Sequence, residues 1–111
     1  MIFSQTTSAW VALIFAGLFE IGWAIGLKYT DGFEKLWPSL VTLACMIASF
    51  QLLSMALRDI PFGTAYTIWT GIGAVGAVTA GVLLFGDALT LARLSAIALV
   101  LAGVVMLKLA E

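Results

Sequence analysis

The residues from Ser8 to Leu27 read SAWVALIFAGLFEIGWAIGL, a run of twenty in which Glu20 is the only charged residue. About 20 consecutive apolar residues form a helix that crosses the ~30 Å hydrocarbon core of a bilayer. The run therefore predicts a transmembrane helix with Glu20 at membrane depth. Because a charge there costs about 2.5–3.5 kcal/mol on insertion scales, such a residue indicates a functional site. The structural alternative is a protonated carboxyl that hydrogen-bonds between helices.

The composition predicts an integral membrane protein. The chain has 111 residues, of which 63% are hydrophobic and 10% charged, and its mean hydropathy is +1.16. Soluble domains carry about 25% charged residues. The sequence has no histidine and one cysteine, which excludes His/Cys zinc sites, disulfide frameworks and Ser-His or Cys-His catalysis. We therefore expect no metal, no cofactor and no enzymatic activity.

Charged and turn-forming residues divide the remaining chain into further apolar spans. The predicted spans are about 8–27, 38–57, 62–85 and 90–107. Pro38 and Pro61 stand where the second and third helices begin, and proline suits the first helical turn. The sequence thus predicts an all-α integral membrane fold, with residues 1–111 as a single four-helix domain.

The basic residues are nearly balanced between the two sides of such a bundle. Four spans put Arg58 and Lys108 on one side and Lys28, Lys35 and Arg93 on the other. Because an excess of Lys and Arg marks the cytoplasmic side, this balance gives almost no orientation signal. Insertion in both orientations and insertion in one orientation through weaker cues both remain open.

Several polar and aromatic side chains are expected at the depth of Glu20. On a helix, residues three or four positions apart share a face, which puts Gly17 and Trp23 beside the carboxyl. The second span contributes Ser49, and Tyr66 and Trp69 fall on one stripe of the third. Such aromatic stripes also occur as packing or interfacial belts. Together with a carboxylate they indicate a cation site, because aromatic faces attract cations.

A chain of this size is too small to enclose a transport pathway, so a transporter built from it should be an oligomer. The fourth span contains small residues at helical spacing, which allow membrane helices to approach closely. These residues are Ala92, Ala96, Ala98, Ala102 and Gly103. Packing within one chain is the alternative use for them.

Nearly the whole chain, from Trp10 to Lys108, resembles the small multidrug resistance family of bacterial proton-coupled exporters. The resemblance is carried by the size, the four spans, the lone glutamate and a set of motifs. The motifs are Phe19-Glu20, Lys28-Tyr29 with Gly32-Phe33, Trp37-Pro38-Ser39, Ala48-Ser49-Phe50 and the segment 61–73, PFGTAYTIWTGIG. Within the family, Trp23 and Lys108 match the guanidinium exporter subtype. Thr67 and Asp87 depart from the common pattern.

The resemblance implies an antiparallel, dual-topology homodimer in the bacterial inner membrane. It implies that Glu20 binds proton or substrate and that Gly17, Trp23, Ser49, Tyr66 and Trp69 line the site. The implied function is proton-coupled antiport that exports guanidinium and small guanidinyl cations by alternating access, with no nucleic acid as partner. Trp23 and Ser49 are expected to orient the carboxylate through indole and hydroxyl donors. Two alternatives are a multidrug exporter of quaternary ammonium or aromatic cations and a non-transporting partner subunit.

Overall fold

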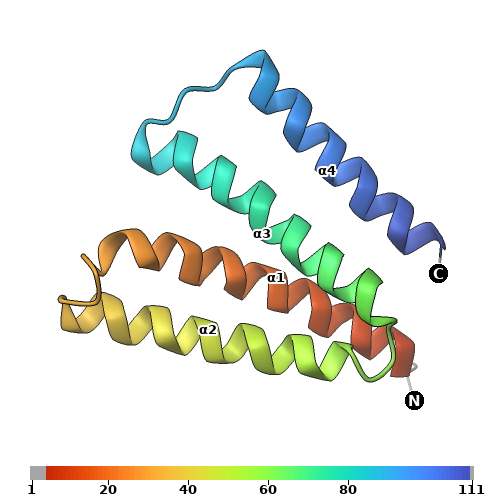
Figure 1. Ribbon diagram of the computed structural model, residues 1–111. Helices are drawn as coiled ribbons and strands as arrows, with labels where there is room; N and C mark the ends of the chain where they lie inside the picture. The colour runs from red at the N-terminus through yellow and green to blue at the C-terminus, as the bar shows by residue number, and fades with distance from the viewer. Residues whose placement is uncertain (1–4, 111) are drawn as a thin grey trace.

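The computed structural model describes residues 5–110, which fold into four helices (Figure 1). They are α1 (Gln5–Tyr29), α2 (Leu36–Ala56), α3 (Phe62–Phe85) and α4 (Leu91–Ala110). Each is long and apolar enough to cross a membrane, with a mean hydropathy between 1.8 and 2.0. The expectation of four apolar membrane helices is confirmed.

The first two helices extend beyond the spans read from hydropathy. Span 1 was expected at 8–27 and span 2 at 38–57, whereas α1 continues to Tyr29 and α2 begins at Leu36. Hydropathy marks the part of a helix that lies in hydrocarbon, but backbone hydrogen bonds continue until the chain turns. The turn here is closed by the Lys35 N–H, which donates to Thr30 O over 3.1 Å.

The α1–α2 turn is tight because three consecutive residues adopt the left-handed backbone conformation. The φ angles are 52° at Asp31, 68° at Gly32 and 67° at Phe33. Left-handed backbone is uncommon for residues other than glycine, so two of these three residues are held there by their surroundings. Thr30, just before them, is buried, and its hydroxyl donates to Leu27 O over 2.9 Å.

The core lies where α1 packs against both α2 and α3. Most of the buried side chains on α1 are alanines, which bring the helix axes close together. The buried core residues are Ala9, Ala12, Leu13, Ala16, Leu53, Ala56, Ile60, Ala65, Ile68 and Trp69. None of them comes from α4. The core is therefore a three-helix unit.

α1 packs tightly against α2 at Gly26. A Cβ built on Gly26 would meet the hydroxyl oxygen of Thr42, and it would lie 3.5 Å from Thr42 Cα. Thr42 is fully buried. Because a backbone atom stands so near, a larger residue at Gly26 would have to push the two helices apart.

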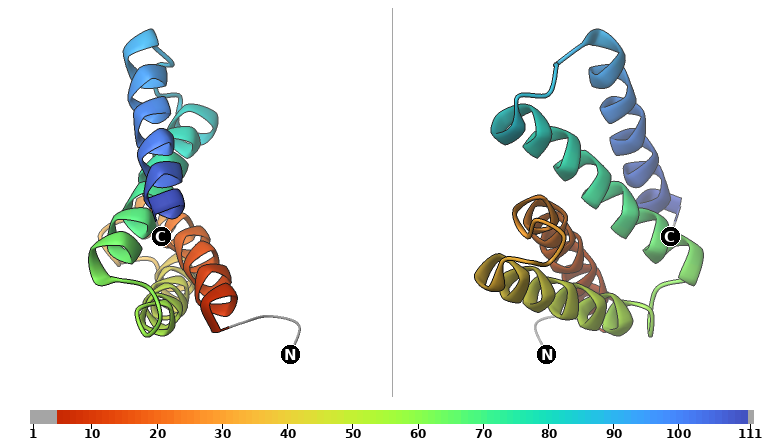
Figure 2. Two further views of the ribbon diagram at one scale, coloured as in Figure 1. Left: turned by 90° about the vertical axis from the view of Figure 1, so that its right-hand side faces the viewer. Right: turned by 60° about the vertical axis from the view of Figure 1, so that its left-hand side comes forward.

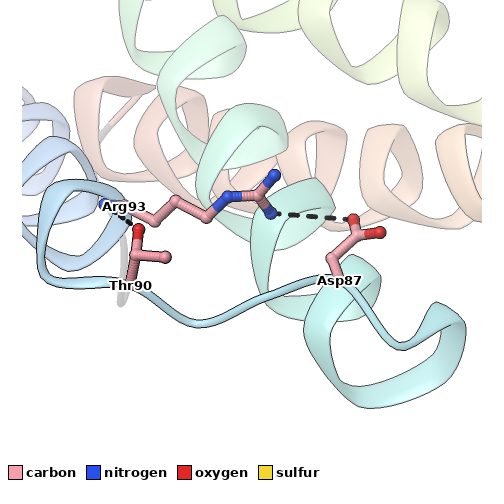
Figure 3. A network of polar contacts seen from close by, with 3 residues as sticks. All are labelled: Asp87, Thr90 and Arg93. Atoms are coloured by element: carbon pink, nitrogen blue, oxygen red, sulfur yellow. Dashed lines mark hydrogen bonds and ion pairs between the residues drawn. The ribbon is translucent and has the colours of Figure 1, made fainter.

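The last helix lies beyond α3, away from α2, as two further views show (Figure 2). None of residues 91–110 is buried. Gly86, in the left-handed conformation with φ 72°, ends α3. Thr90 then caps α4, because its hydroxyl oxygen accepts a hydrogen bond from Arg93 N over 3.1 Å, and Asp87 lies 3.9 Å from the Arg93 guanidinium (Figure 3).

One side chain ties the far end of α4 to α1. The Lys108 ammonium lies 4.5 Å from the centre of the Trp10 ring. This is within the range of a cation–π contact. The contact joins the C-terminal end of α4 to the N-terminal part of the helix that carries Glu20.

The Gly26 contact gives a test of the packing. We expect Gly26→Ala to lower the melting temperature of the detergent-solubilised protein, because overpacking a tight contact costs about 1–3 kcal/mol. Gly63→Ala is the matched control, since a Cβ at Gly63 has nothing within 4 Å and alanine stabilises a helix by about 0.5–1 kcal/mol over glycine. A melting temperature of Gly26→Ala at or above that of Gly63→Ala would contradict this packing.

Candidate functional site

The carboxyl group of Glu20 lies against the backbone of α3. A Cβ built on Gly73 would meet the carboxyl carbon and both carboxyl oxygens of Glu20, so with a larger residue at this position the carboxyl would have to move. Gly73 itself is buried. Among residues 5–110, Oε1 of Glu20 is a buried atom without a hydrogen-bond partner. The carboxyl thus has an acceptor available for a ligand or for a second chain.

Gly17, one turn before Glu20, also faces α3. A Cβ at Gly17 would lie 2.6 Å from Cγ2 of Ile72. The glycine therefore admits the Ile72 side chain rather than touching the carboxyl. Gly17 and Gly73 together set the spacing between α1 and α3 at the level of Glu20.

Ser49 joins three helices through two hydrogen bonds. Its hydroxyl donates to Ala16 O on α1 over 2.7 Å and accepts from Trp69 Nε1 on α3 over 3.0 Å. Ser49 is fully buried and Trp69 nearly so. The expected donation from Ser49 to Glu20 is wrong for this chain, because a hydroxyl has one proton and Ala16 O accepts it. Ser49 instead fixes the indole of Trp69.

Trp23 has a buried indole nitrogen that makes no hydrogen bond within residues 5–110. The expected bond from this indole to the carboxylate is therefore not formed within the described chain. The Trp23 ring meets the edge of Phe50, with the ring centres 6.2 Å apart and the planes at 67°. Trp23 thus offers one free donor close to the membrane depth of Glu20.

The aromatic rings of three helices form one connected group. Phe50 on α2 also meets Trp69, with centres 6.0 Å apart, and Trp69 meets Tyr66 at 5.4 Å. Trp23, Tyr66 and Trp69 were predicted from the sequence, and the structure joins them through Phe50. Phe50 was not among the predicted site residues, because its two ring partners belong to other helices. Gly73 shares the sequence stripe of Tyr66 and Trp69, but its contact with the Glu20 carboxyl was not predicted.

A separate apolar cavity lies between α3 and α4. Its volume is about 760 Å³, and it has an almost entirely apolar lining. Of the predicted site residues, Tyr66 lines it. Glu20, Trp23, Ser49 and Trp69 do not. The cavity is therefore separate from the place of the Glu20 carboxyl, although Tyr66, which lines the cavity, also contacts Trp69.

Comparison with known proteins assigns a family to this arrangement. Residues 8–100 match the family described as Small Multidrug Resistance protein. A guanidinium exporter of Citrobacter freundii is 54% identical over 101 residues, which cover 91% of this chain and 96% of that protein. A guanidinium exporter of Yersinia pseudotuberculosis is 53% identical over 103 residues, covering 93% and 99%.

The resemblance read from the sequence motifs is confirmed by both kinds of match. A family match over residues 8–100 covers α1 from residue 8 onward, all of α2 and α3, and the first half of α4. The chain is thus a multi-pass membrane protein, and it belongs to the small multidrug resistance family.

Proposed function

We propose that the protein exports guanidinium and small guanidinyl cations in exchange for protons. The observation that carries this proposal is the carboxyl of Glu20, held in an apolar helix bundle with an unpartnered oxygen. A carboxylate in that position binds a proton or a cation but not both. The names of the relatives at 53–54% identity support guanidinium as the cation.

Guanidinium suits the groups around Glu20. It is a flat cation whose N–H donors match a carboxylate in bidentate fashion, and it stacks on aromatic faces. The Tyr66, Trp69 and Phe50 rings supply such faces in the same bundle. Trp69 is locked by Ser49, so its ring is already oriented before a ligand arrives. This reduces the entropy lost on binding.

The transport unit is an antiparallel homodimer of chains inserted in opposite orientations in the bacterial inner membrane. The uncovered α4 supports this assembly, because none of its residues 91–110 is buried in the chain. The balance of basic residues supports dual insertion. Two copies of Glu20 then face one cavity, and the free indole N–H of Trp23 is available to a carboxylate or to an ordered water there.

Coupling follows from competition for the same carboxylates. A proton that binds Glu20 displaces guanidinium, and guanidinium binds only after the proton leaves. Alternating access of the pseudo-symmetric dimer, with one opening at a time, turns this competition into antiport. Glu20, the only charged group at this depth in α1, therefore couples proton movement to guanidinium movement.

Replacement of the carboxyl tests this role. We expect Glu20→Gln to abolish proton-driven guanidinium uptake into proteoliposomes, because glutamine keeps the shape but can neither ionise nor exchange a proton. Glu34→Gln, in the exposed α1–α2 turn, is the control and should transport like the wild type. Wild-type uptake by Glu20→Gln would refute the assignment of Glu20.

Topology is tested by labelling from each side of the membrane. In a Cys45→Ser background, Ala88→Cys places a thiol in the exposed α3–α4 loop. An impermeant maleimide added outside intact cells should label about half of the molecules, and the rest only after permeabilisation. Labelling of all active molecules from one side alone would rule out dual topology.

Substrate choice separates guanidinium export from multidrug export. A quaternary ammonium has no N–H donor, so acceptors in the site would stay unpaired, at a cost of about 1–3 kcal/mol for each buried mismatch. One lost contact corresponds to roughly tenfold discrimination at ~1.4 kcal/mol per decade. We expect guanidinium and singly substituted guanidinyl compounds to be transported faster than tetraethylammonium, and Trp23→Gly to weaken this preference. Faster transport of tetraethylammonium by the wild type would favour the multidrug function.

A further inference from the structure

A line of aromatic rings runs along α3 from its first residue toward Glu20. Phe62, Tyr66 and Trp69 are spaced four and three residues apart, so they share one helical face. The Phe62 and Tyr66 rings are stacked, with centres 5.6 Å apart and planes at 25°. Tyr66 and Trp69 follow at 5.4 Å and 56°. Adjacent rings along this face are therefore in contact.

The same face leads to the carboxyl. Gly73, whose backbone meets Glu20, lies four residues after Trp69. At a rise of about 1.5 Å per residue, the eleven steps from Phe62 to Gly73 span roughly 16 Å. That is about half the thickness of the hydrocarbon core. The rings thus cover the distance between the end of the helix and the depth of Glu20.

Exposure falls steadily along this line. The exposed fraction is 69% for Phe62, 47% for Tyr66 and 7% for Trp69. A cation that follows the rings therefore passes from an open site to an enclosed one. A cation–π contact is stronger at a desolvated ring than at an exposed one, so the attraction grows as water is lost.

We propose that Phe62 is a further substrate-contacting residue, the outermost ring of an aromatic path along which guanidinium travels between the membrane surface and Glu20. The proposal rests on the proposed guanidinium transport. In an antiparallel dimer the two Phe62 rings lie at opposite membrane faces, so each opening has its own path. Phe62 lowers the barrier to entry and exit but does not belong to the final binding site.

An exposed aromatic at a helix end also occurs as a simple interfacial anchor. The two roles predict different kinetics. A ring that guides the cation changes the rate of capture, measured as kcat/KM, and leaves equilibrium affinity unchanged. An anchor changes insertion or stability and does not depend on the charge of the substrate.

The test compares Phe62→Leu, Phe62→Tyr and the control Trp37→Leu in proteoliposomes. Trp37 is a similarly exposed aromatic in the first turn of α2, with 73% of its surface exposed. We expect Phe62→Leu to lower kcat/KM for guanidinium about two- to fivefold, the change that an exposed cation–π contact corresponds to. Phe62→Tyr should restore the rate, and Trp37→Leu should match the wild type.

Equilibrium guanidinium affinity and melting temperature, measured on the same purified proteins, complete the experiment. Both should be unchanged in Phe62→Leu. The proposal is overturned if kcat/KM of Phe62→Leu equals that of the wild type, if Phe62→Tyr fails to rescue it, or if affinity falls in parallel. Absence of guanidinium transport by the wild type would instead overturn the proposed function, so the two failures are distinguishable.

Discussion

The contact between the Glu20 carboxyl and the backbone at Gly73 is the constraint on which the rest of the bundle depends. A carboxyl group in hydrocarbon needs space and partners, and α3 supplies space by omitting a side chain at this position. To reach that contact, α1 must pack closely on α3, which requires Gly17 opposite Ile72. Close packing of α1 on α2, through Gly26 and Thr42, then completes the three-helix core.

The hydrogen bonds of Ser49 are a second constraint on how the helices pack. Its two hydrogen bonds connect the α1 backbone, the α2 side chain and the α3 indole in one chain of donors and acceptors. In a membrane interior, where unpaired polar groups are costly, such a chain fixes the relative rotation of helices. The Trp69 ring, which contacts Phe50 and Tyr66, is therefore held by the same bonds that hold the helices together.

Sequence reasoning predicts the features that depend on local composition. The four apolar helices, the membrane depth of Glu20 and the family motifs are all readable from residue order and charge. The direction of the Ser49 hydroxyl could not be predicted from residue order, because Ala16 O and Glu20 lie four residues apart on α1 and offer competing acceptors. The roles of Gly73 and Phe50 depend on contacts between helices. Helix spacing and rotation decide those contacts, and hydropathy carries no information about either.

In the proposed dimer, the exposure of α4 has a consequence for the amount of protein in the cell. Val104 and Leu107 pack against the core, but α4 has no buried residue within its own chain, and in the proposed dimer it packs against the second copy. In obligate dimers, folding stability depends on the concentration of protomers. The survival of each newly inserted chain then depends on how soon it meets another, so abundance should rise more steeply than synthesis at low expression.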